Sequence, residues 1–202
     1  MCYNQTIMIF TPRLQEAINL CARLHRDQIR KDFEQTPVIT HPFSVMIILS
    51  EITNDEDILI AGLMHDTLED VPKYSYERLV EDTNERVAEI VKGVTEELNP
   101  NLLPEEQFPW LRRKENYLNN LKTASIESVI VSVADKTHNI QSMLLGARTH
   151  DNTQFEKFKG SIRNTLWFFD EIENIANDRL GKDHILVTKM SQSLHELKEI
   201  LK

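Results

Sequence analysis

Glycine and proline are scarce in this chain, which has five glycines and seven prolines among its 202 residues. Together they make up about half of the roughly 12% that is usual in proteins. A β-sandwich or β-barrel needs a turn signal every eight to twelve residues or so, and glycine and proline supply most of those signals. The sequence therefore favours an all-α fold of long helices joined by few turns.

The charge balance limits what the chain can bind. Its 23 Lys and Arg residues face 32 Asp and Glu residues, which gives a net charge of −9. Proteins that bind nucleic acid polymers need a basic face for the phosphates, so we expect no nucleic acid partner. Hydrophobic residues make up 41% of the chain, which is enough for a folded core. The length fits a single domain over residues 1–202, with two domains as the alternative.

The two cysteines, Cys2 and Cys21, are too few for a disulfide framework or a four-cysteine zinc site. The first ten residues have neither the basic segment nor the long apolar segment of a signal peptide. The longest uncharged stretch, residues 36–50, contains Pro37, His41 and Pro42 and is too short to span a bilayer. We therefore expect a cytoplasmic protein without a membrane segment.

Eight or nine helices and no strand are predicted from the pattern of apolar residues. Thr11 and Pro12 suit the start of the first helix, which we expect to end near Arg30 and Lys31. Residues 129–134 could pass for a buried strand, but their apolar stripe continues for almost twenty residues, so we favour a helix. Three prolines mark residues 99–109 as a long surface loop or a linker. The other helices are expected at residues 43–52, 54 or 55 to 70, 75–80, 85–98, 111–122, 126–145, 155–177 and 184–202.

A cluster of acidic residues at one helix end points to a cation. His65, Asp66, Glu69 and Asp70 share one face of a predicted helix just before Pro72. Carboxylates are disfavoured at a helix C-terminus and at i, i+4 spacing, and the apolar residues before His65 predict partial burial. A divalent metal held by His65 and Asp66 would offset this charge. The alternative is a solvated acidic helix end.

Two further residues favour the metal. His41 lies just before the short apolar helix expected at residues 43–52, and Asp135 stands in the middle of a helix, where aspartate has a poor propensity. Two histidines and two aspartates form a mixed set that suits manganese, iron, cobalt or zinc. Such a centre can activate water and polarise a phosphoryl oxygen. Glu69 and Asp70 are then candidates to position or deprotonate the attacking water, with a supporting or surface role as the alternative.

Local basic groups stand out in an acidic chain. The predicted anion contacts are Arg30 and Lys31 after the first helix, Arg113 and Lys114 after the proline-rich segment, and Lys136 beside Asp135. Solvated surface charge is the alternative reading of these groups. His25 lies on the apolar stripe of the first helix, so we expect a core histidine with its hydrogen bonds satisfied.

Four motifs in a fixed order resemble those of the HD-domain metal-dependent phosphohydrolases, and in particular the hydrolase domain of RelA/SpoT-type proteins and their small relatives. They are His25-x-x-Gln28-x-Arg30-Lys31, Thr36-Pro37-x-Ile39-x-His41-Pro42, His65-Asp66-x-x-Glu69-Asp70 and Ala134-Asp135-Lys136-x-His138-Asn139.

This resemblance implies an all-α HD-domain bundle with one divalent metal, usually Mn²⁺. It implies hydrolysis of the 3′-pyrophosphate of guanosine tetra- or pentaphosphate, (p)ppGpp. The metal ligands it implies are His41, His65, Asp66 and Asp135. Glu69 and Asp70 would belong to the catalytic water network, and Arg30, Lys31 and Asn139 would lie near the nucleotide.

Two departures from the family pattern leave the substrate open. Val38 stands where the family usually has an aromatic residue, and Glu96 where a basic residue is common. The alternatives are a phosphohydrolase for another nucleotide, including a phosphorylated nicotinamide cofactor, and a nucleotide-binding module without catalysis. Aromatic residues late in the chain fit either core packing or a homodimer face. They are Phe155, Phe158, Trp167, Phe168 and Phe169.

Overall fold

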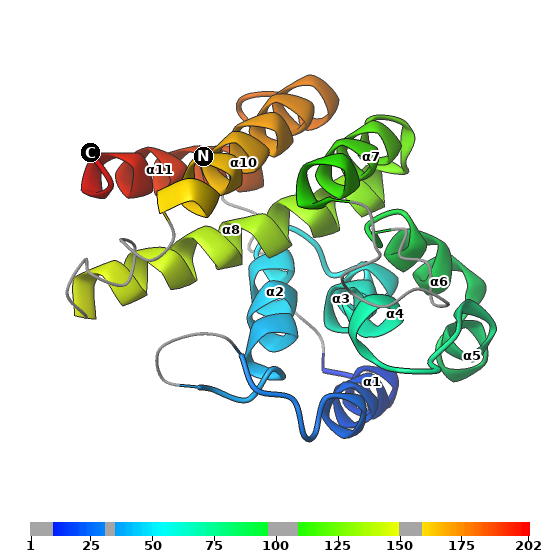
Figure 1. The fold of residues 1–202 in the computed structure, drawn as a ribbon. Coiled ribbons are helices and arrows are strands. Elements are labelled where there is room, and N and C mark those ends of the chain that lie inside the picture. The colour runs from blue at the N-terminus through cyan, green and yellow to red at the C-terminus, as the bar shows by residue number, and fades with distance from the viewer. Residues whose placement is uncertain (1–9, 31–34, 97–108, 150–158) are drawn as a thin grey trace. The chain divides into compact units, whose positions relative to one another are not determined.

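The computed structural model of this chain describes residues 10–30, 35–96, 109–149 and 159–202 (Figure 1). The all-α prediction is confirmed, since these residues form helices, and the only β-type pairing among them is one isolated bridge between Ile29 and Pro37. The chain divides into two compact units, Met1–Lys92 and Gly93–Lys202, which we call the first and the second unit. No helix in the described ranges has both the length and the apolar character needed to cross a membrane.

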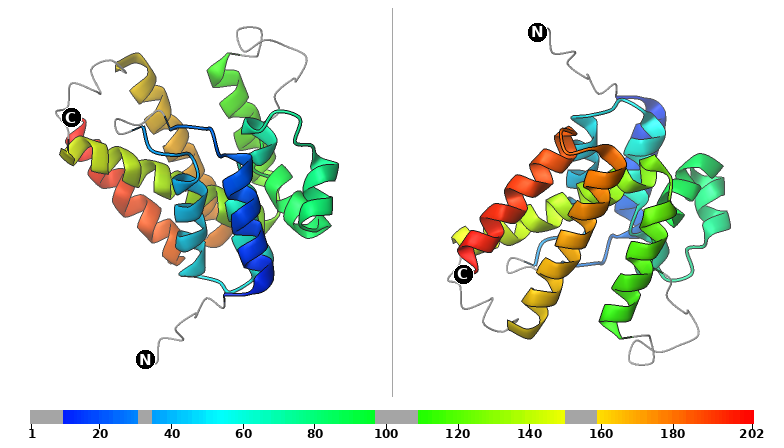
Figure 2. Two further views of the ribbon diagram at one scale, coloured as in Figure 1. Left: turned by 90° about the horizontal axis from the view of Figure 1, so that it is seen from below. Right: turned by 90° about the horizontal axis from the view of Figure 1, so that it is seen from above.

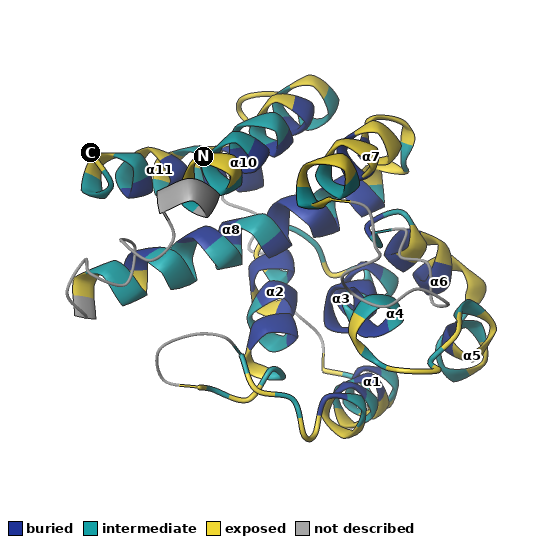
Figure 3. Ribbon diagram, in the orientation of Figure 1, coloured by how far each residue is buried: buried dark blue, intermediate teal, exposed yellow. Residues whose placement is uncertain are grey.

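The first unit is built around a helix that is buried almost all round. Residues 58–64 of α3 are all buried, and α1, α2 and α6 pack against this helix (Figure 3). Gly62 lets α2 approach closely, because a Cβ at this position would collide with the Leu49 side chain. The helices of this unit are α1 (Pro12–Leu24), α2 (Thr40–Ser50), α3 (Glu56–Met64), α4 (Thr67–Asp70), α5 (Tyr76–Asp82) and α6 (Glu85–Lys92).

The first helix begins as predicted but ends earlier. The Thr11 side chain accepts a hydrogen bond from the Leu14 amide, and Pro12 occupies the first turn. The prediction that this helix reaches Arg30 is wrong, because the chain turns after Leu24. The backbone near residue 30 pairs instead with the approach to α2: the Arg30 amide donates to Thr36 O at 2.8 Å. Lys31 lies outside the described residues.

The second helix begins at Thr40, three residues before the expected start. Pro42 lies in the first turn of this helix, where its missing N–H costs no intrahelical hydrogen bond. His41 is therefore a helical residue with a defined direction, and it is buried.

The second unit contains α7 (Trp110–Thr123), α8 (Ile126–Thr149), α10 (Lys159–Leu180) and α11 (Ile185–Ile200). Helices α10 and α11 both pack along α8, and α10 also contacts α7 (Figure 2). Residues 129–134 are helical, so the preference for a helix there over a strand is confirmed. Phe168 and Phe169 are buried, whereas Phe155, Phe158 and most of the proline-rich segment lie outside the described residues.

Candidate metal centre

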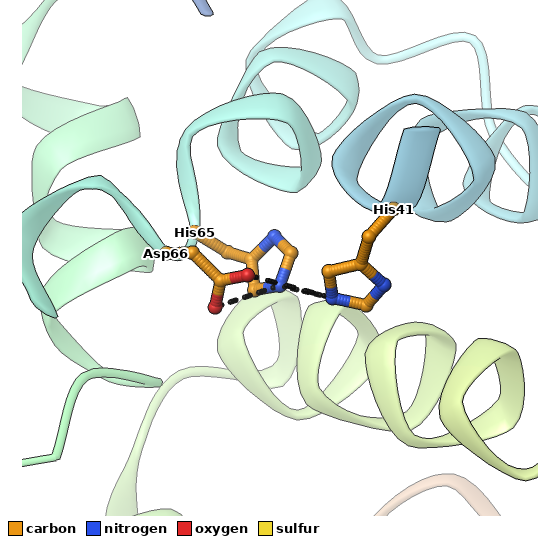
Figure 4. Close-up of side chains that lie close together, drawn as sticks. All are labelled: His41, His65 and Asp66. Carbon is orange, nitrogen blue, oxygen red and sulfur yellow. Dashed lines mark hydrogen bonds and ion pairs between the residues drawn. The ribbon is translucent and has the colours of Figure 1, made fainter. Parts of the chain in front are cut away.

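Three predicted metal ligands meet in the first unit. His41 lies in the first turn of α2, His65 directly follows α3, and Asp66 directly precedes α4. Their ligand atoms all lie within 4.8 Å of one another (Figure 4). The sequence prediction that these three residues share one site agrees with this geometry.

The junction between α3 and α4 places His65 and Asp66. One continuous helix up to Asp70 was expected, but the helix breaks at these two residues. The last carbonyls of a helix have no intrahelical partner, and here three successive carbonyls accept hydrogen bonds from side chains. The pairs are His65 Nδ1 with Gly62 O at 2.8 Å, Cys21 Sγ with Leu63 O at 3.0 Å, and Thr67 Oγ1 with Met64 O at 2.6 Å.

The hydrogen bond to Gly62 also determines which ring nitrogen of His65 carries the proton. A carbonyl oxygen only accepts, so Nδ1 of His65 carries a proton and Nε2 offers a lone pair in the neutral ring. Nε2 lies 3.1 Å from His41 Nε2 and 3.1 Å from Asp66 Oδ1. His41 Nε2 lies 3.5 Å from Asp66 Oδ2. His65 Nε2 therefore faces a second imidazole nitrogen and a carboxylate oxygen at distances that a shared proton or a metal ion can bridge.

The donor set fits a divalent transition metal. Two imidazole nitrogens and a carboxylate oxygen form the mixed set that such ions prefer. The Gly62 carbonyl holds the ring of His65 from its far side, as is typical of histidines that bind a metal. His41 and His65 are buried, while the Asp66 side chain keeps 25% of its surface exposed. The group is therefore anchored in the protein core and open to solvent on the side of Asp66.

Glu69 and Asp70 follow Asp66 in the single turn of α4. The amide of Asp70 donates to Asp66 O at 2.9 Å, which joins the backbone of this turn to the residue predicted as a metal ligand. Burial among neighbouring atoms and the charge of Asp66 raise the pKa of Asp70, although part of its surface remains exposed. His25, His65 and His41 act in the opposite direction on this pKa.

Asp135, the fourth predicted ligand, is buried on α8 in the second unit. The side chain of Asn139 donates to its Oδ1 at 2.7 Å, and Lys136 forms an ion pair with it. Because the other three residues belong to the first unit, the place of Asp135 in the ligand set stays a prediction. Asn139 and Lys136, both predicted near the nucleotide, lie against this carboxylate.

The predicted phosphate contacts Arg113 and Lys114 both pair with Glu96. Arg113 Nε lies 3.2 Å from Glu96 Oε2, and Lys114 forms an ion pair with the other oxygen. Burial opposes ionisation of Glu96, but the charges of Lys114 and Lys136 and the hydrogen bonds outweigh it and lower its pKa. Of the cations predicted after the first helix, Arg30 is half-buried.

Two features of the first unit were not found by sequence reasoning. Cys21 and Gly62 support the α3–α4 junction, and neither residue type signals such a role. His25 was expected to be fully satisfied, which is wrong: it is buried, but its Nε2 has no hydrogen-bond partner among the described residues. Its Nδ1 lies 2.6 Å from Oε1 of Gln28, whose spacing from His25 was part of the first motif.

Comparison with protein families gives one match that covers most of the chain. A family model of the HD domain matches residues 17–161, which includes all four predicted metal ligands. This range also spans parts of both units.

Two curated proteins are similar in sequence. Guanosine-3′,5′-bis(diphosphate) 3′-pyrophosphohydrolase MESH1 of Danio rerio is 35% identical over 136 residues, which cover 66% of this chain and 70% of that protein. The bifunctional (p)ppGpp synthase/hydrolase SpoT of Escherichia coli K12 is 30% identical over 193 residues, or 90% of this chain. The match spans only 24% of SpoT.

Two solved structures share the fold. One is of a metazoan ortholog of SpoT described as hydrolysing ppGpp, with a TM-score of 0.72, 22% identity, and coverage of 94% of this chain and 98% of the other. The second is lmo0812 from Listeria monocytogenes, with a TM-score of 0.61 and 24% identity over 82% of this chain and 98% of the other. At this identity the two likenesses concern the fold alone.

Proposed function

Because the chain belongs to the HD-domain family and is related to (p)ppGpp pyrophosphohydrolases, we propose that it hydrolyses the 3′-pyrophosphate of (p)ppGpp in a metal-dependent reaction. The observation that carries this proposal is the meeting of His41, His65 and Asp66, with Glu69 and Asp70 one helical turn beyond them. The named relatives supply the substrate class.

The residues proposed to hold the metal are His41, His65 and Asp66, with Asp135 as the fourth ligand. Manganese is the proposed ion, because the mixed nitrogen and oxygen set suits it and the family resemblance implies it. When bound, a divalent ion supplies positive charge for the phosphoryl oxygens and lowers the pKa of a nearby water.

The carboxylates of α4 are proposed to handle the water. Glu69 and Asp70 lie in the helical turn that follows Asp66. Their backbone amides donate to the carbonyl of Asp66, the proposed ligand. A carboxylate placed there can orient the attacking water and accept its proton. Asp70 is partly exposed, which leaves it accessible to water and substrate.

The proposed nucleotide contacts combine cations with one amide. Arg30 and Lys31 lie on the segment between α1 and α2, which leads to His41. Charged donors of this kind bind phosphate oxygens strongly. The other proposed contacts are Asn139, Lys136, Arg113 and Lys114 from the second unit.

The pairing of Glu96 favours a second candidate, hydrolysis of another phosphorylated nucleotide. Arg113 and Lys114 already neutralise Glu96, whose side chain is only 9% exposed. These two cations are therefore less available to a highly charged substrate such as (p)ppGpp. A phosphorylated nicotinamide cofactor carries fewer phosphate charges and would need fewer free cations.

The domain organisation, the location and the partners of the enzyme are also proposals. We propose a single HD-type domain over residues 1–202, since the family match spans parts of both units. A cytoplasmic location is supported by the buried free thiol of Cys21, and the proposed partner is a small nucleotide rather than a nucleic acid polymer. A homodimer would have to use surfaces other than Phe168 and Phe169, which are buried.

Release of pyrophosphate from ppGpp in the presence of Mn²⁺ tests the proposal. We expect turnover by the wild-type chain and a loss of about a thousand-fold or more in kcat for Asp66→Ala, because the variant removes a metal ligand. A panel of other nucleotides measured in parallel separates the two candidates. Activity unchanged in Asp66→Ala would show that the site is assigned wrongly, and preferred turnover of a nicotinamide cofactor would favour the second candidate.

A further inference from the structure

Burial of His25 costs free energy, because one of its ring nitrogens is left without a hydrogen bond, and packing alone does not explain why a histidine stands here. It keeps only 1% of its surface exposed, and its Nε2 has no hydrogen-bond partner in the described part of the chain. An apolar side chain would fill this position without leaving a buried nitrogen unpaired. The other ring nitrogen, Nδ1, lies 2.6 Å from Gln28 Oε1. The contact with Gln28 is therefore the feature that distinguishes histidine from an apolar residue here.

This contact selects one orientation of the Gln28 amide. The amide oxygen only accepts, so Nδ1 of His25 carries the proton and donates to it. The NH₂ group of Gln28 must then point the opposite way, and it donates to the backbone carbonyl of Asp70 at 2.6 Å. If the amide were rotated by half a turn, its oxygen would face the Asp70 carbonyl oxygen, and His25 would have to carry its proton on the unpaired Nε2 in order to accept at Nδ1.

Gln28 thereby connects two parts of the proposed active site within the first unit. Its side chain holds the end of α4, which carries the proposed catalytic carboxylates. Its backbone carbonyl accepts from the Val38 amide at 2.9 Å, and the Val38 carbonyl accepts from the amide of His41 at 2.9 Å. One residue therefore links the backbone of Asp70 to the backbone of a metal-ligand residue.

The four-residue helix α4 depends on such outside support. A single helical turn is not stable by itself, and the carbonyl of its last residue lacks a partner within the helix. The Gln28 amide supplies that partner for Asp70. Loss of this hydrogen bond would let the turn that carries Glu69 and Asp70 shift, while Asp66 stays fixed by its junction with α3.

We infer that Gln28 is a positioning residue for the hydrolytic site and that His25 holds its amide in the required orientation. The inference deepens the proposed function, on which its activity measurements rest. It assigns a role to the His25-x-x-Gln28 pair that does not involve contact with the metal or with the substrate.

The first experiment compares Gln28→Met with the wild type. Methionine has a similar length but neither the donor nor the acceptor. We expect kcat for ppGpp hydrolysis to fall about ten-fold or more, as is usual when an outer support of a metal site is lost, while KM changes less than about two-fold. Thr83→Val is the matched control, since it removes a side-chain hydrogen bond to Leu79 O in the same unit and should leave both constants unchanged.

A pair of His25 variants tests the orientation argument. His25→Asn keeps an N–H donor near the position of Nδ1 and omits the unpaired nitrogen, whereas His25→Leu removes the donor. We expect His25→Asn to retain kcat within about three-fold of the wild type and His25→Leu to resemble Gln28→Met. Equal loss in the two His25 variants would overturn the role of His25.

Amide hydrogen exchange gives a readout that does not need activity. The amides of Asp70 and Val71 are hydrogen-bonded within α4, and we expect them to exchange about ten-fold faster in Gln28→Met but not in Thr83→Val. Unchanged exchange, or faster exchange with an unchanged kcat, would overturn the inference. If the wild type does not hydrolyse ppGpp, the proposed function fails and the exchange rates alone decide the inference.

Discussion

Two sites of this chain, one in each unit, surround an acidic side chain with different kinds of group. In the first unit, electron-pair donors lie against one another: His65 Nε2 is 3.1 Å from both His41 Nε2 and Asp66 Oδ1. In the second unit, carboxylates lie against cations and amides: Asp135 contacts Lys136 and Asn139. The difference teaches that a metal site is marked by donors facing donors rather than by acidity itself.

The same comparison applies to Glu96, the residue that departs from the family pattern. Its carboxylate contacts Arg113 and Lys114, and the Lys114 Nζ lies 4.8 Å from the centre of the Phe168 ring. Lys136 Nζ lies 5.7 Å from the same ring. Charges and aromatic faces therefore stabilise one another in the second unit. This cluster sets its carboxylate against cations, unlike the donor group of the first unit.

Asp135 tests this comparison most strongly. Its carboxylate is paired with a cation, as that of Glu96 is, but it is predicted to be a metal ligand, as Asp66 is. We expect Asp135→Asn to lower kcat for ppGpp about a hundred-fold or more, since a metal ligand is lost while the shape is kept. The measurement is steady-state pyrophosphate release at saturating Mn²⁺. A reduction of less than about three-fold would place Asp135 with the self-contained pairs of the second unit.

The variant Glu96→Gln tests the ion pairs of the second unit through the dependence of their stabilising effect on pH. The pKa of Glu96 is lowered from its usual 4.5, so its ion pairs stabilise the fold above that value, and the contribution is lost as pH falls through the lowered pKa. We expect the variant to be about 2 kcal/mol less stable at pH 7, with a smaller difference at pH 4, below the usual pKa of the carboxyl group. Urea unfolding at both pH values measures this. A difference that is equal at the two pH values would contradict the ion-pair account.

Cys21→Ala gives the smallest expected effect and tests the support beneath the donor group. The variant removes the hydrogen bond to Leu63 O and leaves a small cavity, which should lower the free energy of unfolding by about 1 kcal/mol. Burial and the charge of Asp66 raise the pKa of this thiol to about 12. In the native wild type it should therefore resist alkylation at pH 8. Rapid alkylation would contradict the buried contact.

The sequence predicted the all-α fold because scarce turn residues and helical apolar stripes are local signals. It also predicted that His41, His65 and Asp66 share a site, since their residue types suit one ion. The break between α3 and α4 could not be predicted, because the contact of Cys21 with Leu63 O at this junction joins positions 42 residues apart in the sequence. The predicted start of α2 at residue 43 is three residues late, because the first turn of the helix includes Pro42.

The pairing of His25 with Gln28 also could not be predicted from local sequence patterns. The i, i+3 spacing suggested a place on the helix stripe, but the helix ends at Leu24 and Gln28 lies beyond it. The two residues meet through a turn, and the contact between Gln28 and Asp70 joins positions 42 residues apart. Contacts of this kind follow from tertiary packing, which local patterns do not contain.

Binding of Mn²⁺ to the purified chain tests the central claim most directly. The spin-resonance signal of free Mn²⁺ should show one ion bound per wild-type chain and an affinity at least about a hundred-fold weaker in His65→Gln, with the helical circular dichroism unchanged. His65→Gln keeps a polar side chain but removes the imidazole donor. Equal stoichiometry and affinity in the two proteins would contradict the assignment of His41, His65 and Asp66 as a metal centre.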